Sequence, residues 1–313
     1  MKVFSVGEML IDFLPGSEAG TYVRKAGGAP ANAAIALARQ GCDTSFCGML
    51  GNDDFGRFLL ETLRENNVTP VVRLTDEAVT TMAFVTLDEQ GDRSFTFARK
   101  PGADMLLTRE QVQCDAFEQA QLVHAGSCSL SKGSARDATV YALSQGHADG
   151  KLISFDVNYR NVMWDDDEQA AARAVREILP FVDFLKISEE EAGMLGGEAQ
   201  IPSVMEQYEI SVVVETLGAQ GVRCYWNGRQ LELSGLQAAC VDATGAGDAF
   251  WGAFLAALSR AEVTATAQLT ETLLWEALRA GNIAGWLCVQ KKGAIESLPT
   301  RAQVEHYLHQ MYP

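Results

Sequence analysis

Short, mostly apolar runs recur along the chain, and stretches with helical periodicity lie between them. The runs that predict strands are residues 3–6, 44–47, 122–125, 152–157, 183–187 and 211–216. Such runs are typical of strands covered on both faces of a parallel sheet. The clearest helical patterns lie near residues 30–41, 55–66 and 133–145. The alternation predicts a doubly wound, mainly parallel α/β sheet flanked by helices.

The alternation breaks between residues 71 and 103. Residues 80–88 and 93–99 predict two strands, with Phe95 and Phe97 at alternate positions and a glycine-containing turn at residues 88–92. Two consecutive strands without a helix do not fit a parallel sheet. We therefore expect a small antiparallel β lid outside the main sheet, formed by about residues 12–26 and 71–103. Within it, residues 16–26 have a loop-like, polar composition.

Beyond residue 103 the strand–helix pattern returns. Residues 222–226 and 229–233 predict a hairpin around Asn227-Gly228, and residues 269–289 predict a last long helix. The sequence contains no internal repeat, low-complexity tract or linker. A length of 313 residues with 47% hydrophobic residues is sufficient for one large core. The pattern indicates a single domain, residues 1–313, with one lid insertion.

The acidic composition argues against several classes of partner. A net charge of −16 repels nucleic acid and anionic membranes, so an anionic substrate would need a local positive site. The longest apolar runs are far below membrane-spanning length, and Glu8 and Asp12 interrupt the apolar segment that a signal peptide requires. Seven cysteines without a Cys-x-x-Cys motif argue against a disulfide framework and a zinc site, and favour a cytoplasmic location.

The most informative stretch is Asp242-Ala-Thr-Gly-Ala-Gly-Asp-Ala-Phe250. Its small residues Gly245, Ala246 and Gly247 lead into a predicted helix, whose first N–H groups lack helical partners and suit a phosphate. Asp248 lies in the first turn of that helix. It could take a proton from a hydroxyl as that hydroxyl meets a phosphoryl group, or it could simply cap the helix.

A second glycine-rich stretch, Gly27-Gly-Ala-Pro-Ala-Asn32, opens the helix that ends near Gly41. Proline is well placed near a helix start. Asn32 is the only polar residue in the first two turns of this alanine-rich helix. A buried Asn needs hydrogen-bond partners, which either a polyhydroxylated ligand or the backbone of a neighbouring loop could supply.

Further polar residues follow predicted strands, at the edge of the sheet that faces the ligand crevice in open α/β folds. Residues 8–12 read as a continuation of the first strand, which places Asp12 at such an end, and the segment Asp156-Val-Asn158-Tyr-Arg160 follows a later strand. Arg99 ends the lid sheet. On position alone, Asp12 fits an ordinary surface acid better than a ligand contact, and Arg99 could be a solvated arginine. Ser188 and Glu191 fit a capping box.

The chain lacks the sequence signatures of several other protein classes. The chain contains no Gly-x4-Gly-Lys-Ser/Thr, and the Gly-x-Gly at 245–247 has Phe250 where a dinucleotide fold would carry its third glycine. Residues 54–56 match the protein-kinase magnesium motif by letters only, and residues 126–130 do not form a nucleophile elbow.

Taken together, the two glycine stretches resemble the signatures of the ribokinase-like (PfkB) carbohydrate kinase family. The first signature continues through Gly48-Met-Leu-Gly-Asn-Asp-Asp-Phe-Gly56, and the second is the stretch that contains Asp248. Both occur in the expected order, and the resemblance covers essentially the full chain. The opening Gly7-Glu-Met-Leu-Ile-Asp12 and the segment leading to Pro101-Gly-Ala-Asp104 are most similar to the fructokinase branch.

The resemblance implies an ATP-dependent kinase that phosphorylates a primary hydroxyl of a small sugar, with Asp248 as base. The amides of Gly245, Ala246, Gly247 and Asp248 would form the anion hole. The residues expected to contact the sugar or its phosphoryl donor are Asp12, Gly28, Asn32, Arg99, Asn158 and Arg160. Those expected at the ATP site are Ser188, Thr216, Gly218, Gly221 and Asn282. Glu191 would organise Mg²⁺ through water. The monovalent-cation site, suited to K⁺, would comprise Asp242, Thr244, Cys288, Lys291, Gly293 and Ser297.

One departure and several alternatives remain open at this point. The family usually has Asn-x-x-Glu, where this chain has Ser188-Glu-Glu-Glu191, which affects the metal arrangement. The substrate could be fructose, 2-keto-3-deoxygluconate, ribose or a riboside. A protein of another class, a non-catalytic sugar-responsive binder on the same scaffold, is a further alternative. We also expect a homodimer through an apolar lid face, with Phe84, Phe95 and Phe97 as candidates.

Overall fold

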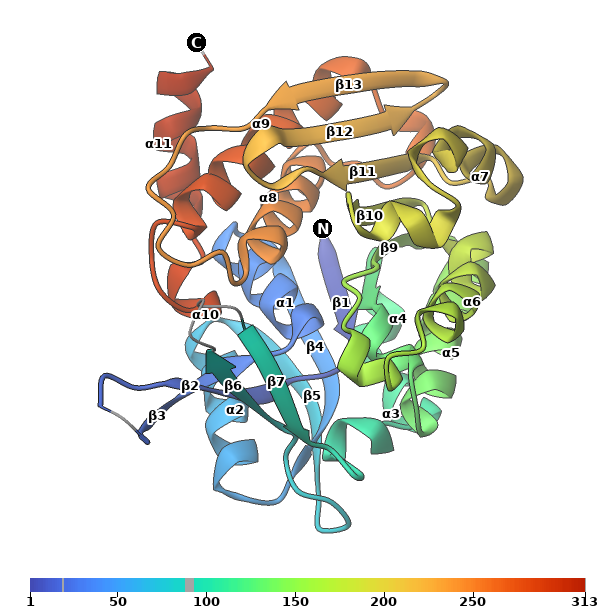
Figure 1. The fold of residues 1–313 in the computed structure, drawn as a ribbon. Helices are drawn as coiled ribbons and strands as arrows, with labels where there is room; N and C mark the ends of the chain where they lie inside the picture. Colours follow the sequence, from blue (N-terminus) through green and yellow to red (C-terminus); the bar gives the residue numbers. More distant parts are fainter. Residues whose placement is uncertain (19, 88–92, 313) are drawn as a thin grey trace.

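A computed structural model describes residues 1–18, 20–87 and 93–312. Among these residues, nine strands form the main sheet, in the order β13-β12-β11-β10-β9-β8-β1-β4-β5 (Figure 1). The strands are β1 (Lys2–Val6), β4 (Asp43–Gly51), β5 (Val68–Thr75), β8 (Leu122–Gly126), β9 (Leu152–Asp156), β10 (Phe184–Ser188), β11 (Val212–Thr216), β12 (Gly221–Trp226) and β13 (Arg229–Ser234). The pairings from β5 to β11 are parallel, and β12 and β13 add an antiparallel hairpin. The expected mainly parallel sheet is confirmed.

Helices cover both faces of this sheet, which explains why its strands are apolar on both sides (Figure 1). One face carries α1 (Ala29–Arg39), α2 (Asp54–Glu65), α8 (Ala246–Arg260), α9 (Glu271–Cys288), α10 (Ala294–Ser297) and α11 (Arg301–Met311). The other carries α3 (Arg109–Val112), α4 (Asp115–Gln119), α5 (Ser134–Ala148), α6 (Glu168–Ile178) and α7 (Ile201–Tyr208). Short 3-10 helices lie in the connections: η1 (Ala103–Leu106), η2 (Ser127–Leu130), η3 (Asn161–Trp164), η4 (Leu179–Phe181), η5 (Glu191–Leu195), η6 (Glu198–Gln200), η7 (Gly218–Gln220) and η8 (Thr266–Gln268).

The order of the strands reverses between β1 and β8, which are neighbours in the sheet but far apart in sequence. Ligands of open α/β folds bind outside the carboxyl ends of the strands at such a switch point. The main sheet therefore predicts one edge for the site, where the segments after β1, β8, β9 and β10 meet.

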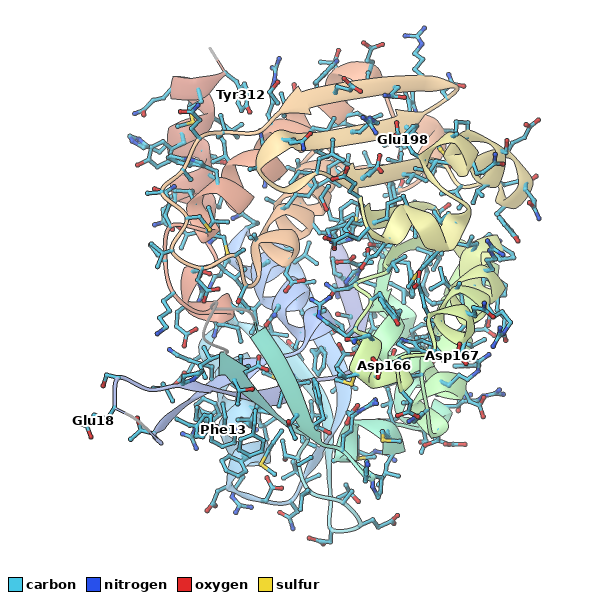
Figure 2. All side chains as sticks on the ribbon, in the orientation of Figure 1. Phe13, Glu18, Asp166, Asp167, Glu198 and Tyr312 are labelled. Atoms are coloured by element: carbon cyan, nitrogen blue, oxygen red, sulfur yellow. The ribbon has the colours of Figure 1, made fainter. Side chains whose placement is uncertain are left out.

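A second sheet, which we call the small sheet, is formed within the described ranges by β2 (Leu10–Pro15), β3 (Tyr22–Gly27), β6 (Met82–Leu87) and β7 (Arg93–Ala98) in the order β3-β2-β6-β7. Its two hairpins are antiparallel, and β2 pairs with β6 in parallel. Phe13 of β2 stacks on Phe84 at 4.9 Å and meets Phe55 of α2 edge-on at 5.6 Å between ring centroids (Figure 2). This face of the small sheet is thereby packed against α2.

Three expectations about these two sheets are wrong. Residues 8–12 do not continue β1: the backbone turns at Gly7, and the chain enters β2 of the small sheet, so Asp12 lies on that sheet and not at a main-sheet end. Residues 22–26, expected as loop, belong to β3 despite their polar composition, because β2 pairs with them residue by residue. Strand β5 pairs with β4 and so belongs to the main sheet.

One strand is longer than predicted, two further helices are present, and one expected turn lies outside the described residues. Strand β4 continues to Gly51, beyond the predicted residue 47, because β5 supplies a partner along its whole length. The helix predicted at residues 269–289 is not the last one, because α10 and α11 follow α9. The turn at residues 88–92 lies outside the described residues. Across the described ranges, no helix combines the length and the apolar character needed to cross a membrane.

The helices that begin with the two glycine motifs, α1 and α8, pack directly against each other. Gly252 of α8 faces Ala36 of α1, and a Cβ added at Gly252 would lie 2.4 Å from the Cβ of Ala36. Since real carbon atoms do not approach that closely, the glycine is required for the spacing of the two helices.

We predict that Gly252→Ala lowers the free energy of unfolding by about 1–3 kcal/mol, because overpacking outweighs the gain in helix propensity. Urea unfolding measures the difference. The matched control is Gly285→Ala in α9, where the nearest atom to an added Cβ lies 3.5 Å away, and which should be neutral or slightly stabilising. Equal effects of the two substitutions would contradict the spacing argument.

Candidate active site

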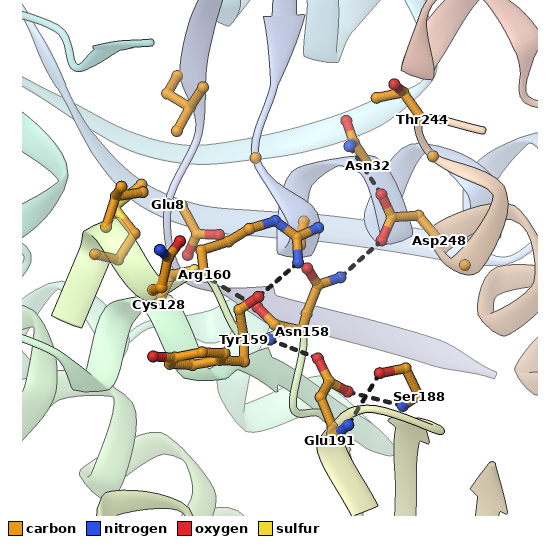
Figure 3. Close-up of a pocket in the computed structure, with 18 of the residues that line it drawn as sticks. Glu8, Asn32, Cys128, Asn158, Tyr159, Arg160, Ser188, Glu191, Thr244 and Asp248 are labelled. Carbon is orange, nitrogen blue, oxygen red and sulfur yellow. Dashed lines mark hydrogen bonds between the residues drawn. The ribbon is translucent and has the colours of Figure 1, made fainter. Parts of the chain in front are cut away.

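A cleft of roughly 710 Å³ lies between the carboxyl edge of the main sheet and the small sheet. Its wall on the main-sheet side includes Asn32, Asn158 and Asp248 (Figure 3), and the small sheet contributes Asp12 and Phe97. Segments from five distant parts of the chain thus converge on one space. The cleft lies at the edge that the strand order predicts.

Asp248 is placed at the start of α8 by a left-handed turn. Gly245 has φ 80°, and an added Cβ would lie 3.0 Å from the Cα of Ala294. Only glycine accepts both the positive φ and the close backbone approach. The turn brings Asp248 into the cleft with 6% of its surface exposed.

Two side-chain amides hold the carboxylate of Asp248. Asn32 donates from Nδ2 to Oδ2 at 2.9 Å, and Asn158 donates from Nδ2 to Oδ1 at 3.4 Å (Figure 3). Burial and the nearby Asp156 raise the pKa of Asp248 to about 6, against the opposing effects of the hydrogen bond from Asn32 and the charges of Lys186 and Arg160. A carboxyl with this pKa is ionised at neutral pH yet basic enough to accept a proton.

The amides expected to form an anion hole are partly available. Gly247 and Asp248 lie in the first turn of α8, where amides lack helical partners, and both residues line the cleft. Ala246 differs from the expectation, since its amide donates to the carbonyl of Ala243 at 3.2 Å and closes the turn. The helix end therefore offers amides beside a carboxylate, an arrangement suited to a phosphoryl group next to a base.

The second glycine motif supplies another part of the main-sheet wall. Gly28 has φ 109°, and an added Cβ would lie 2.6 Å from the carbonyl oxygen of Glu8. This contact lets α1 begin close to the end of β1, so that Asn32 reaches Asp248. The buried Oδ1 of Asn32 has no partner among the described residues, and the same is true of Oδ1 of Asn158. Both amides are thus oriented by the carboxylate and keep acceptor capacity.

The two arginines that we expected near the substrate behave differently. Arg160 is exposed at the cleft, where it donates to the carbonyl of Tyr159 at 2.8 Å. Arg99 is buried and donates from Nε and Nη2 to Asp104 at 2.9 and 2.7 Å. The guanidinium of Arg99 is therefore engaged behind the cleft wall, and the structure does not bring it into the cleft with Arg160.

The residues expected at the ATP site separate into two groups. Ser188 and Thr216 line the cleft. Gly218, Gly221 and Asn282 lie away from its lining among the described residues: Gly221 has φ 114° at the start of β12, and Asn282 donates to the carbonyl of Ser234 and to the hydroxyl of Tyr312.

Ser188 and Glu191 form the reciprocal bonds of the expected capping box, with the Ser188 amide donating to Glu191 Oε2 at 2.8 Å and the Glu191 amide donating to Ser188 Oγ at 3.2 Å. Glu191 Oε1 accepts from the amide of Tyr159 at 2.6 Å (Figure 3). In the described part of the chain, no group of three His, Cys, Asp or Glu side chains could hold a metal ion. Backbone amides donate to both carboxylate oxygens of Glu191. Mg²⁺ in proteins usually binds waters, phosphates and only one or two carboxylates, so Glu191 fits contact with a water of the Mg²⁺ shell better than direct coordination.

Most residues of the expected monovalent-cation site do meet. Asp242 accepts from the Thr244 amide at 3.0 Å and from the Gly293 amide at 3.0 Å. The Sγ of Cys288 lies 3.7 Å from the Thr244 carbonyl oxygen and 2.9 Å from Ser297 Oγ. Lys291 is exposed beside them. Carbonyl oxygens near a buried carboxylate suit a hard cation, so the donor set is compatible with K⁺.

Three buried ionisable residues were not among our candidates: Glu8 and Lys186, which line the cleft, and Asp156, which pairs with Lys186. Burial raises the pKa of Glu8 to about 7, and Lys186 donates to both oxygens of Asp156 at 2.9 and 2.8 Å. A sequence signal for the pair existed, since a lysine inside an otherwise apolar predicted strand requires a buried partner. The partner itself, on another strand, was not predictable from spacing.

With this geometry described, the relatives are informative. Residues 1–301 match the family described as pfkB family carbohydrate kinase. The chain is 37% identical over 317 residues to fructokinase-2 of Oryza sativa subsp. japonica, covering 98% of this chain and 93% of that protein. A fructokinase from Xylella fastidiosa, solved with bound ATP, superposes with a TM-score of 0.92 at 31% identity, covering 100% and 99% of the two chains.

A fructokinase variant from Vibrio cholerae O395, solved with fructose, ADP and potassium ion, has a TM-score of 0.89 at 33% identity, covering 98% of this chain and 97% of that one. The family match and these similarities extend over the sheet, the small sheet and both glycine motifs. The chain belongs to the pfkB family of carbohydrate kinases.

Proposed function

We propose that this protein transfers the γ-phosphoryl group of ATP to a primary hydroxyl of fructose. The observation that carries the proposal is Asp248, a buried carboxylate at the amide-rich end of α8 that two asparagines orient into the cleft. Fructose and ATP are favoured as substrates because the Vibrio cholerae and Xylella fastidiosa relatives are described with fructose and with ATP bound.

In the proposed reaction, Asp248 accepts the proton of the hydroxyl as its oxygen attacks the γ-phosphorus and the bond to the β-phosphate oxygen breaks, which releases ADP. The amides of Gly247 and Asp248 and the exposed charge of Arg160 stabilise the phosphoryl oxygens. Asp12, Gly28, Asn32 and Asn158 would contact the sugar. Ser188 and Thr216 would contact the phosphates, and Gly218, Gly221 and Asn282 are assigned to the more distant nucleotide subsite.

Two cations accompany this proposal. Mg²⁺ would bind the ATP phosphates and neutralise their charge, with Glu191 oriented towards its water shell by the amides of Tyr159 and Ser188. K⁺ would bind at the loop of Asp242, where the donor set is compatible with it. For Arg99, the ion pair with Asp104 supports a role in holding the wall, and not in direct contact with sugar.

The function is tested by a coupled assay of ATP consumption over fructose, ribose, 2-keto-3-deoxygluconate and a riboside. We expect the highest kcat/KM with fructose, and Asp248→Asn should lower turnover at least ~10²-fold while sugar binding persists, because the base is lost and its shape is kept.

Asp137→Asn is the matched control, since Asp137 is an exposed carboxylate in the first turn of α5, remote from the cleft. It should leave turnover unchanged. Near-normal turnover of Asp248→Asn would remove the base role. Sugar binding without ATP consumption by the wild type would instead favour a non-catalytic sugar-responsive binder.

The pH dependence provides an independent prediction. Burial raises the pKa of Asp248 to about 6. The base must be ionised to accept a proton, so kcat/KM should rise with pH through about 6 with a slope of one and flatten above it. A profile with an acid limb near pH 4, the range of an ordinary carboxyl, would contradict the raised pKa.

We also propose a cytoplasmic homodimer that contacts through the small sheet. All seven cysteines are free thiols, which supports a reducing location. Of the expected contact residues, Phe97 lines the cleft, Phe84 stacks on Phe13, and the Phe95 side chain lies outside the described ones. Instead, β3 exposes 46% of Tyr22 and 47% of Val23.

Multi-angle light scattering should therefore give the mass of two chains, and Val23→Glu should shift the equilibrium towards one, because a charge cannot be buried there without a partner. The control is Lys2→Glu, which changes the charge at the start of β1, away from the small sheet. A monomeric wild type at micromolar concentration would end the dimer proposal.

A further inference from the structure

Lys186 is an unusual residue for the centre of a parallel sheet. It belongs to β10, between the apolar residues Leu185 and Ile187, and only 5% of its surface is exposed. Its ammonium donates to both oxygens of Asp156 on the neighbouring strand β9, at 2.9 and 2.8 Å. Asp156 is equally buried, with 3% of its surface exposed. Buried ion pairs seldom stabilise a fold more than apolar residues of the same volume would, so a functional reason for this one is worth seeking.

The ammonium of Lys186 lies against the helix turn that carries the candidate base. A Cβ built on Gly247 would lie 3.2 Å from the Nζ of Lys186, which places the ammonium against the first turn of α8. Asp156 is also tied to the site through Asn158, which donates from Nδ2 to Asp156 at 3.3 Å and to Asp248 at 3.4 Å. One amide group therefore links the ion pair to the base.

We propose that the Lys186–Asp156 pair is a positioning unit of the reaction: Lys186 supplies the positive charge that lets Asp156 orient Asn158 beside Asp248 without its negative charge disabling the base. The inference rests on the proposed function, because it assigns a role relative to Asp248 as base. It adds two residues, neither of which contacts the substrate in the proposed reaction.

The charges around Asp248 support this assignment. Asp156 of β9 raises the pKa of Asp248, while Lys186 of β10 and Arg160 of the loop after β9 lower it. From α1 the facing group is the neutral amide of Asn32, and on α9 the thiol of Cys288 is near enough to feel the charge of Asp248.

Glu191, at the start of η5, is the third carboxylate around the same ammonium, and the pKa of Glu191 is raised by burial and by Asp156 and lowered by Lys186. Lys186 is thus the buried cation shared by three carboxylates: Asp156, Glu191 and Asp248.

Opposite substitutions in the pair should move the activity in opposite directions. In Lys186→Met the uncompensated Asp156 makes Asp248 harder to ionise, so the acid limb of kcat/KM should move up by about one pH unit, a tenfold loss at a fixed pH on that limb. In Asp156→Asn the negative charge that disfavours ionisation of Asp248 is lost, while the favourable charge of Lys186 stays. The acid limb of kcat/KM should therefore move to lower pH by a similar amount. The pH of the acid limb reflects the titration of the coupled carboxylates as a group and not of Asp248 alone.

The double variant Lys186→Met/Asp156→Asn separates charge from structure. Removing both charges should return the acid limb to the wild-type position, while kcat falls because Asn158 has lost part of its orientation beside Asp248. Thermal unfolding verifies that each variant is folded. If Lys186→Met does not fold, Asp156→Asn and the double variant still test the inference. The double variant is expected to fold, because replacing both partners of a buried ion pair is better tolerated than leaving one charge unpaired.

The inference is overturned if the single variants shift the limb in the same direction or leave it in place, or if the double variant behaves like Asp156→Asn alone. Such a result would leave the base role intact as long as Asp248→Asn remains inactive. If Asp248→Asn is active, the proposed function itself fails, whatever the pair does.

Discussion

The central constraint of the site is that a buried carboxylate, Asp248, lies at the same helix end where the proposed reaction requires a phosphate to bind, although the two negative charges repel each other. Asp248 lies among groups that would repel an anionic donor, yet its two oxygens accept bonds from Asn32 and Asn158. These neutral amides fix the carboxylate without cancelling its basicity. The positive contributions come from the α8 amides, Lys186 and Arg160, so a protein with a net charge of −16 can present a locally favourable site for a nucleotide.

Close packing of small residues makes that arrangement possible. The α1 and α8 helices carry Asn32 and Asp248, and they approach until Gly252 faces Ala36 with no space for a methyl group. Deeper in the sheet, Trp251 donates to Ser154 of β9 at 2.9 Å, which fixes α8 to the strand that ends in Asp156. The arrangement of Asn32 and Asp248 is therefore set by helix spacing as much as by the residues that line the cleft.

Much of the fold and part of the site could be predicted because they depend on local backbone requirements. Gly28 and Gly245 are readable as turns that need positive φ, and Asn32 as a polar residue in an apolar helix. Strand β3 was missed because its first three residues are exposed and the hydrogen bonds that define it come from β2. Arg99 and Lys186 were misjudged or overlooked for the same reason, since the partner that fixes each one is contributed by another segment of the fold.

The connectivity of the small sheet has a mechanical consequence. The chain passes between the small sheet and the main body at four points, and at one of these Gly28, which follows β3, is the N-cap residue of α1. A tilt of the small sheet would pull on the first turn of the helix that bears Asn32, and the strain would reach Asp248 through a single hydrogen bond. The same backbone would thus transmit any displacement of the small sheet to the carboxylate.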